Sequence, residues 1–294
     1  MASPVLSVTH MADPGCPWAY SALPAITVLR WRYGAQLDWR IVTIGLTEST
    51  EQYEQRGYTA ATMARTPLRF ARFGMPFSLG PRARVMATGR ACRVIVSARE
   101  AGGEQRAYAA LRALSLAWFS TTLLLDEPEG LTRALTEGGV ADAEAILAAS
   151  ASDHIEAAYQ RDRQEARSAA GSPSSLQGRT AQTDGVERYT APTLVFARDG
   201  RTLEAGGHQP LGAYDVLVAN LAPRLEVRPP ATDAREVLEE LGHPLGTREV
   251  AAAMAGHDEE PDDHLATAQL LDLVGEGMAT RVPYGANAVW RLAA

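Results

Sequence analysis

A strand that runs into a tight turn and then into a helix opening with Cys-Pro constrains this chain more than any other feature. Val5 to Met11 alternates apolar and β-branched positions, which predicts a strand, and Asp13-Pro14-Gly15 predicts the turn. From Cys16-Pro17 onward, apolar residues recur at helical spacing through Leu29. Proline suits the first helical position because its missing N–H would lack an intrahelical partner there. We therefore expect Cys16 at the N-cap of this helix.

The chain then continues as a strand, a long helical block, a hairpin and a closing helix. Pro24 should kink the first helix. Strands are predicted by alternation or β-branched composition at 37–44, 193–196 and 201–205. Helices are predicted at 83–100, 104–124, 129–137, 142–168 and 211–221. This order indicates an α/β domain over residues 1–224 that carries a large helical insertion at about 58–180.

The last part of the chain predicts a second, smaller unit at residues 231–294. A proline-rich, unpatterned stretch at 223–232 precedes it and is typical of a linker. Thr247 is a suitable N-cap for a helix at 248–255, and a second helix is expected at 263–274. Two short strands, 279–283 and 288–292, flank Tyr284-Gly285-Ala286-Asn287. Two helices followed by a two-stranded wing form a winged-helix-like pattern.

The charge of this C-terminal unit argues against nucleic acid as its partner. Residues 231–294 hold twelve acidic side chains against four arginines. Phosphate contacts dominate DNA affinity and need clustered basic side chains. The roles that stay open for the unit are packing on the main domain, formation of a homodimer and partial cover of the substrate groove.

Other sequence features narrow the compartment and the chemistry. No uninterrupted apolar run of about 18 residues occurs, so no membrane span is expected. The opening segment lacks a basic stretch followed by an apolar one, which argues against a secretory signal. Two cysteines are too few for a disulfide scaffold or a cysteine-rich metal site, and they fit a reducing compartment. We expect a cytoplasmic protein without a metal.

Cys16 is the candidate catalytic residue. A sulfur at a helix N-terminus faces unpaired N–H groups and the positive end of the helix dipole, so its pKa is expected below the ordinary value of about 8.5. This predicts a nucleophile near neutral pH. Residue 19 is alanine, so no neighbouring thiol can resolve a mixed disulfide at Cys16, and release needs a second external thiol.

The segment Asp13-Pro14-Gly15-Cys16-Pro17-Trp18-Ala19-Tyr20 resembles the active-site entrance of the DsbA-like branch of thioredoxin-fold proteins. That branch includes DsbA and FrnE-type oxidoreductases, kappa-class glutathione transferases and 2-hydroxychromene-2-carboxylate isomerases, and the resemblance covers roughly residues 5–223. Redox members hold Cys-Pro-Trp-Cys or a close relative here, whereas isomerase-type members hold serine where Cys16 stands. This chain lies between the two patterns. The resemblance implies a thioredoxin fold with a helical insertion.

A second segment, Tyr189 to Phe196, resembles the cis-proline entry to the third strand of thioredoxin folds. The resemblance places Pro192 against the Cys16 sulfur and leaves the Ala191 backbone free to pair with a bound thiol peptide. Pro17, Trp18 and His208 complete the residues expected to bind substrate or thiol. Tyr20 is expected in the core.

Asp13 in the motif and Cys92 in the helical block each have two possible roles. Asp13 is expected to cap the turn, and tuning of the Cys16 sulfur is the alternative. Cys92 shares a helical face with Val85 and Val96, which is typical of a buried cysteine, and a long-range resolving role is the alternative.

Two hypotheses of different kinds follow. The first is a thiol-dependent enzyme whose Cys16 acts on, or pairs with, a low-molecular-weight thiol. Resemblance implies glutathione, or mycothiol because all 28 basic residues are arginine, a bias of GC-rich coding DNA. The reaction is either thiol-disulfide exchange on a disulfide substrate, or thiol-assisted transfer or isomerisation of a small organic molecule. The second hypothesis is a non-catalytic binding or regulatory protein built on the same fold.

Overall fold

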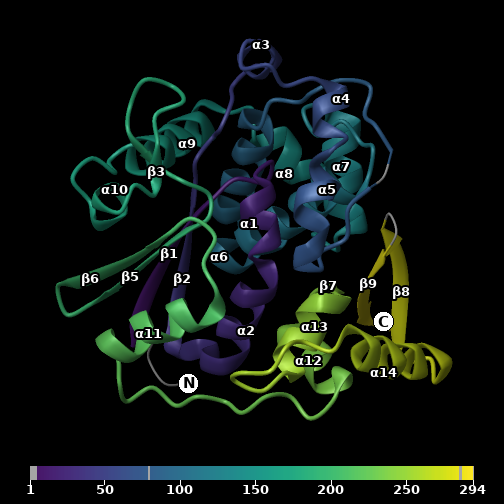
Figure 1. Ribbon diagram of the computed structural model, residues 1–294. Helices are drawn as coiled ribbons and strands as arrows, with labels where there is room; N and C mark the ends of the chain where they lie inside the picture. The colour runs from purple at the N-terminus through teal and green to yellow at the C-terminus, as the bar shows by residue number, and fades with distance from the viewer. Residues whose placement is uncertain (1–4, 79, 285–286, 294) are drawn as a thin grey trace.

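The computed structural model describes residues 5–78, 80–284 and 287–293. Its central sheet has four strands in the order β2-β1-β5-β6 (Figure 1). The strands are β1 (Leu6–Ala12), β2 (Leu37–Thr43), β5 (Thr193–Arg198) and β6 (Arg201–Gly206). β1 runs parallel to β2 and antiparallel to β5, and β5 pairs with β6 through the predicted hairpin. All four strands lie where the sequence pattern predicted them.

Side chains that alternate between buried and exposed along the strands form the core against this sheet. Leu6 and Val8 of β1 are buried, and Val8 pairs across the sheet with Phe196, which is also buried. α1 (Pro17–Ser21) and α2 (Leu23–Tyr33) connect β1 to β2, and they meet at Ala22, two residues before Pro24. After β6, α11 (Leu211–Leu221) packs against the sheet with Tyr214 fully buried. The Cys16 segment follows the C-terminal end of β1, which lies beside the start of β5 in the middle of the sheet.

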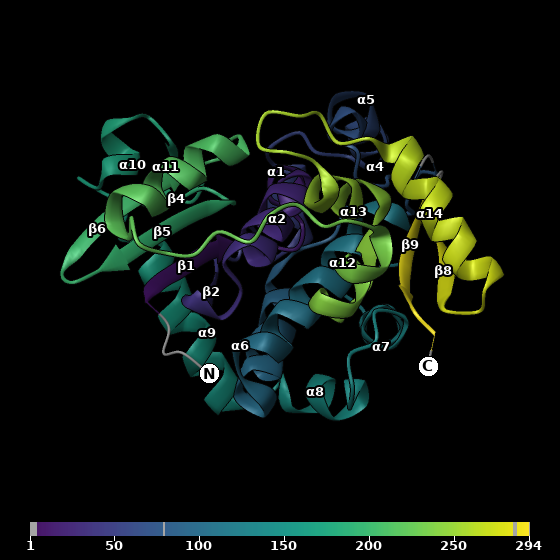
Figure 2. The same cartoon turned by 90° about the horizontal axis from the view of Figure 1, so that it is seen from below.

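The helical insertion covers one face of the sheet and the end of α1 (Figures 1 and 2). Its helices are α3 (Thr50–Glu54), α4 (Ala60–Met63), α5 (Thr66–Phe70), α6 (Gly89–Ser120), α7 (Pro128–Glu137), α8 (Ala143–Ala149), α9 (Asp153–Ala166) and α10 (Pro173–Leu176), with a 3-10 turn at Ala71–Phe73 and another, Gly34–Gln36, after α2. A short hairpin, β3 (Thr180–Ala181) with β4 (Arg188–Tyr189), leads back to the sheet. The sequence pattern did not predict this hairpin.

Two of the predicted helices differ from the structure. The helix expected from residue 83 begins at Gly89, because the N–H groups of Thr88 and Gly89 donate to the Thr47 carbonyl and hold the preceding residues in a loop. The break predicted between residues 100 and 104 is present, since the backbone of α6 is non-helical at Gly102 and Gly103. The helix expected at 142–168 is two helices, since Ser152 caps the start of α9.

The C-terminal unit contains more elements than predicted. It comprises α12 (Ala234–Leu241), β7 (Leu245–Gly246), α13 (Thr247–Met254), α14 (Asp263–Gly275), β8 (Ala279–Tyr284) and β9 (Asn287–Leu292), with sheet order β7-β9-β8. The prediction lacked α12 and β7. Thr247 is not the N-cap, which is Gly246; its hydroxyl instead accepts a hydrogen bond from Trp290 Nε1 at 2.9 Å. Gly285 and Ala286 of the predicted wing turn lie outside the described residues.

A buried ion pair joins the C-terminal unit to the rest of the protein. The carboxylate of Glu249 in α13 accepts hydrogen bonds from both terminal nitrogens of Arg112 in α6, at 2.6 and 2.8 Å. It also accepts one from the Thr27 hydroxyl of α2, at 2.7 Å. Glu249 is fully buried and Arg112 nearly so. α13 also packs directly on α2 (Figure 2). The unit therefore packs on the main domain, one of the three roles considered for it.

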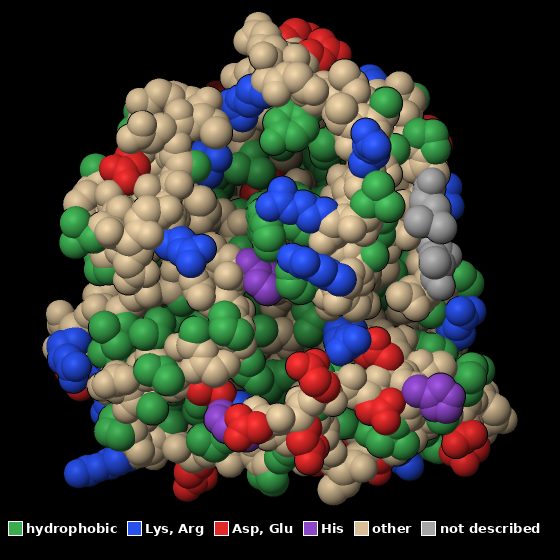
Figure 3. Space-filling model, viewed as in Figure 1, with side chains coloured by type: hydrophobic (Ala, Val, Ile, Leu, Met, Phe, Trp, Pro, Cys, Tyr) green, Lys and Arg blue, Asp and Glu red, His purple; other side chains and the backbone are tan. Residues whose placement is uncertain are grey.

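The surface distribution of charge follows this division. Acidic side chains gather along the lower part of the face in Figure 3, where Figure 1 places the C-terminal unit and the linker, whereas basic side chains surround a hollow at the centre, over α1 and α5.

In the part of the chain that the structure describes, no helix is both long and apolar enough to cross a membrane.

Candidate active site

Cys16 stands at the N-cap of α1, where the sequence predicted it, and Pro17 is the first helical residue. The Cys16 thiol donates a hydrogen bond to the Ala191 carbonyl oxygen, with 3.0 Å between Sγ and O. The Ala191–Pro192 peptide bond is cis. Two segments 175 residues apart in the chain thus meet at one sulfur, and the structure brings Cys16, Pro17, Ala191 and Pro192 together.

Asp13 builds the turn that presents Cys16. Its carboxylate accepts the N–H of Gly15 at 2.9 Å, the N–H of Leu46 at 2.9 Å and the hydroxyl of Thr88 at 3.0 Å. The capping role expected for Asp13 is therefore present, and the same side chain also ties the turn to the loop after β2 and to the start of α6. Gly15 leaves room for this approach, because a Cβ there would lie 2.6 Å from Thr88 Cγ2.

The environment of Cys16 reverses one prediction. The side chain is only 7% exposed, and this burial raises the pKa of the thiol to about 11. The N–H groups of Ala19 and Trp18 at the helix N-terminus lower the pKa, as the helix argument predicts, but desolvation outweighs them and the Asp13 carboxylate adds to the rise. The expectation of a lowered pKa and a free thiolate near neutral pH is wrong for this conformation.

Aromatic side chains close the mouth of the site. Trp18 packs edge-on against Phe70 with 4.8 Å between ring centroids, and His208 lies 5.7 Å from Trp18 and 4.6 Å from Phe73. Trp18 is partly buried under this cover. Phe70 and Phe73 belong to the insertion, so sequence reasoning about the motif alone could not place them. His208 reaches the mouth but contacts aromatic rings, and burial lowers its pKa.

Cationic side chains surround the same mouth. The guanidinium of Arg69 lies 5.0 Å from the Trp18 ring centroid, and that of Arg72 lies 4.9 Å from the Phe73 ring. Arg188 is buried behind the sulfur, donates to the Tyr189 carbonyl at 3.0 Å, and lowers the Cys16 pKa by its charge. The sequence analysis missed these three arginines. Arg188 could have been noticed because it stands four residues before Pro192.

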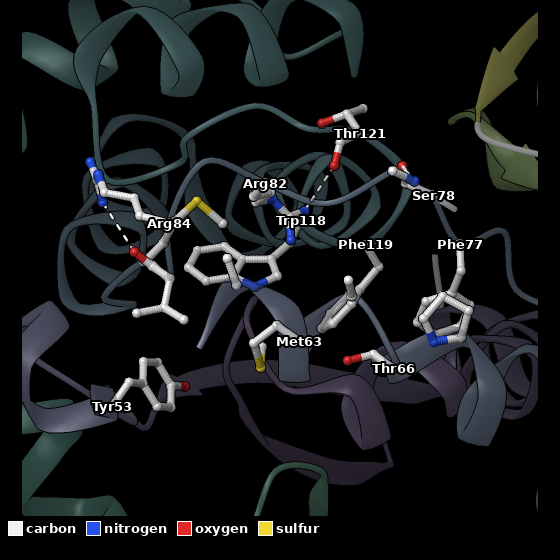
Figure 4. Close-up of a pocket in the computed structure, with 16 residues that line it drawn as sticks. Tyr53, Met63, Thr66, Phe77, Ser78, Arg82, Arg84, Trp118, Phe119 and Thr121 are labelled. Carbon is white, nitrogen blue, oxygen red and sulfur yellow. Dashed lines mark hydrogen bonds between the residues drawn. The ribbon is translucent and has the colours of Figure 1, made fainter. Parts of the chain in front are cut away.

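A narrow cleft lies on the insertion side of the motif, between α4, α5 and the C-terminal end of α6 (Figure 4). Its free volume is about 40 Å³, which suffices for a few water molecules. Tyr53, Met63, Trp118 and Phe119 line it together with the polar side chains of Arg82 and Arg84, so its walls are mixed. Burial raises the pKa of the Tyr53 phenol, with smaller contributions from Asp13 and Cys16, and the Trp118 ring faces Gly15, so this cleft adjoins the turn that presents Cys16.

Cys92 is fully buried and packs with Val96, Ile155 and Tyr159, as its helical face predicted. Its thiol lies 3.6 Å from Asp13 Oδ2, and both cysteines are free. Cys92 thus contacts the turn that precedes Cys16, whereas the Cys16 sulfur contacts Ala191, and no disulfide joins the two cysteines. Among the described residues, no cluster of histidine, cysteine and carboxylate side chains could hold a metal ion.

A four-stranded mixed sheet, a cysteine at the N-terminus of the first helix and a cis proline facing its sulfur define the thioredoxin-fold class. The DSBA-like thioredoxin domain model matches residues 8–188. The chain therefore belongs to the DSBA-like thioredoxin domain family, and the resemblance seen in the sequence is confirmed.

Solved structures with the same fold include three bacterial proteins. Cytosolic disulfide reductase DsbM from Pseudomonas aeruginosa is 22% identical over 74% of this chain and 98% of its own, with a TM-score of 0.51. A probable DsbA oxidoreductase from Streptomyces coelicolor is 18% identical over 77% and 93%, with a TM-score of 0.51. A Nitrosomonas europaea protein assigned to the protein disulfide isomerases is 18% identical over 74% and 97%, with a TM-score of 0.53. At these identities the likeness shows the fold. No curated protein matches the sequence.

Proposed function

We propose that the protein is a thiol-dependent enzyme that uses the single sulfur of Cys16 to act on a low-molecular-weight thiol. The observation that carries the proposal is the position of Cys16 Sγ, at the N-terminus of α1 and 3.0 Å from the carbonyl oxygen that precedes the cis proline. A thiol or a thiol peptide that displaced this internal hydrogen bond would find the Ala191 carbonyl and the sulfur side by side. Pro17, Trp18, Pro192 and His208 would form its walls.

Two reactions are compatible with one sulfur. In exchange, the Cys16 thiolate attacks a disulfide, forms a mixed disulfide and expels a thiolate, and a second external thiol must then release the adduct. In transfer or isomerisation, a protonated Cys16 donates a hydrogen bond to the thiolate of a bound cofactor thiol, which is the nucleophile. The raised pKa of Cys16 favours the second reaction, because the protonated thiol is the donor that it needs.

The charges at the mouth bear on which thiol binds. Glutathione carries two carboxylates at neutral pH, whereas mycothiol carries none. Arg69 and Arg72 stand over the aromatic mouth, and Arg188 lies behind the sulfur. Guanidinium groups pair well with carboxylates, so this arrangement favours glutathione.

A second candidate is the non-catalytic binding or regulatory protein. The observation that favours it is the 7% exposure of Cys16, since a working sulfur must be reached by its substrate. The two candidates differ in whether Cys16 reacts with a small disulfide in solution.

Intact-mass analysis after incubation with oxidised glutathione or oxidised mycothiol tests the proposal. We expect a single adduct on the wild-type chain and on Cys92→Ala, formed faster at higher pH because the thiolate fraction rises, and none on Cys16→Ala. A wild-type chain that stays unmodified even at alkaline pH would favour the non-catalytic protein. Cys16→Ser then separates the two reactions: exchange should vanish, whereas transfer or isomerisation should keep measurable activity.

A further inference from the structure

A second cavity lies far from Cys16 in the fold, where α2, α6 and β2 meet the loop after α12. Its volume is about 540 Å³. Arg30 and Leu37 contribute from the main domain, Tyr108 from α6, and Leu241 and His243 from the C-terminal unit. The cavity is therefore completed by the packing of the two units on each other, and its walls mix apolar and polar side chains.

Arg30 is the central feature of this cavity. Its guanidinium carbon lies 4.3 Å from the ring centroid of Trp39 and 3.6 Å from that of Tyr108. The two rings hold the guanidinium plane in place. Within the described part of the chain, Arg30 makes no salt bridge, and its Nε is buried without a hydrogen-bond partner. Arg30 as a whole is half-buried. Charges taken out of water are ordinarily paired, and this guanidinium has no anionic partner among the described residues.

The polar atoms around Arg30 are also unpartnered. Trp39 Nε1 and the Tyr108 hydroxyl are buried with no hydrogen-bond partner in the described structure, although the two side chains are only 9% and 5% exposed. His243 Nδ1 donates to the Leu241 carbonyl at 2.6 Å, which leaves His243 Nε2 as an unprotonated acceptor, also unpartnered. Buried polar groups in native proteins are nearly always satisfied, so three orphan side chains beside an unpaired guanidinium indicate an absent ligand.

The acidic groups of the cavity are engaged or peripheral. Glu104 accepts the N–H of Ile41 at 2.9 Å, and Glu240 pairs with Arg228 at 2.9 Å. Asp38 is exposed at the rim. None of these forms a salt bridge with Arg30, so the guanidinium stays open to an external anion.

We propose that this cavity binds a small organic carboxylate, with the carboxylate on the Arg30 guanidinium and an apolar body along Leu37 and Leu241. A guanidinium presents a fork of donors that matches a carboxylate. The indole N–H of Trp39 and the hydroxyl of Tyr108 add donors once the side chains adjust to the ligand. The site is independent of Cys16 and of the reaction proposed there.

Calorimetric titration of the full-length chain with 2-naphthoate, and separately with 2-naphthamide, tests this site. The amide has the same shape without the charge. We expect saturable binding of naphthoate at least about tenfold tighter than that of naphthamide, retained in Cys16→Ala and in the surface control Arg198→Met. Arg30→Met should abolish the difference between the two ligands.

Equal affinity for the two ligands, or undiminished naphthoate binding by Arg30→Met, would overturn the proposal. Competition by inorganic phosphate as strong as that by naphthoate itself would overturn the carboxylate assignment. If Arg30→Met fails to fold, Tyr108→Phe and Trp39→Phe keep the test open, because each removes one orphan donor while keeping an aromatic ring at that position. Naphthoate affinity should fall in at least one of them, and unchanged affinity in both would count against the site.

Discussion

The thiol of Cys16 donates its hydrogen bond to the carbonyl oxygen of Ala191, the residue that precedes the cis proline. This contact satisfies a buried thiol and at the same time occupies the backbone acceptor that a bound thiol peptide would use. Substrate must therefore compete with an internal hydrogen bond before it reaches the sulfur.

The pH dependence of alkylation should report a raised pKa at Cys16. In Cys92→Ala, the only thiol left is Cys16. With a pKa of about 11, roughly one thiol in ten thousand is ionised at pH 7. The rate of iodoacetamide addition, followed by intact mass, should rise about tenfold per pH unit past pH 9. A rate that levels off near neutral pH would show instead that the helix N-terminus dominates over burial.

Opening the aromatic mouth should expose the sulfur. Trp18→Ala removes the ring that packs on Phe70 and His208, so water can reach Cys16 and the desolvation that raises its pKa should diminish. We expect alkylation at pH 8 to be faster by roughly tenfold or more. Leu68→Ala is the matched control, because Leu68 lies on α5, the helix that carries Phe70, and is 84% exposed. Equal rates in both variants would rule out a covering role for Trp18.

The buried Arg112–Glu249 pair should hold the C-terminal unit in place. Glu249→Ala leaves Arg112 buried and uncompensated, and we expect it to lower the free energy of unfolding by about 3–5 kcal/mol. The double variant Arg112→Met with Glu249→Leu should recover much of that loss, because no charge stays buried. The exposed pair Arg133–Glu137 provides the control: Glu137→Ala should change stability by less than about 1 kcal/mol. Urea unfolding measures these variants together with the single variants Arg112→Met and Glu249→Leu. A loss in the double variant equal to the sum of the two single losses would contradict the coupling.

Acid should destabilise the protein through His10. This side chain in β1 is 1% exposed with both ring nitrogens unpartnered among the described residues, and burial lowers its pKa to about 3. In the unfolded chain His10 has its ordinary pKa of 6.5, so the unfolded state takes up the proton at a higher pH than the folded state does. The stability linked to neutral His10 is therefore complete above pH 6.5 and is lost as the pH falls towards 3. The loss amounts to roughly 4 kcal/mol. His10→Leu should flatten this part of the pH profile, and an unchanged slope would show that other groups carry it.

Much of this fold follows from local patterns, and the parts that do not follow depend on distant residues. Asp13-Pro14-Gly15 and Pro17 act within a few residues of Cys16, so the turn and the N-cap could be predicted. The burial of Cys16 could not, because the aromatic cover comes from Phe70 and Phe73 in the insertion, more than fifty residues away. The predicted direction of the Cys16 pKa shift was therefore wrong.

The missed elements of the C-terminal unit have two different explanations. α12 had a local signal, since Asp233 accepts the Glu236 N–H at 2.9 Å as an N-cap before an amphipathic helix. β7 had none, because its two residues form a strand only by pairing with Trp290 and Val289 of β9. Such a short strand is defined by its partner rather than by its own pattern.

Calorimetric binding of reduced glutathione to the wild-type chain, Cys16→Ser and Cys16→Ala tests the central claim most directly. The account predicts saturable binding to the wild type and to Cys16→Ser, since both present a hydrogen-bond donor at position 16, and binding weaker by about tenfold or more in Cys16→Ala, which cannot stabilise the bound thiolate. Glutathione affinity that is the same in all three chains, or absent from all three, would contradict the claim that the atom at position 16 holds the thiol.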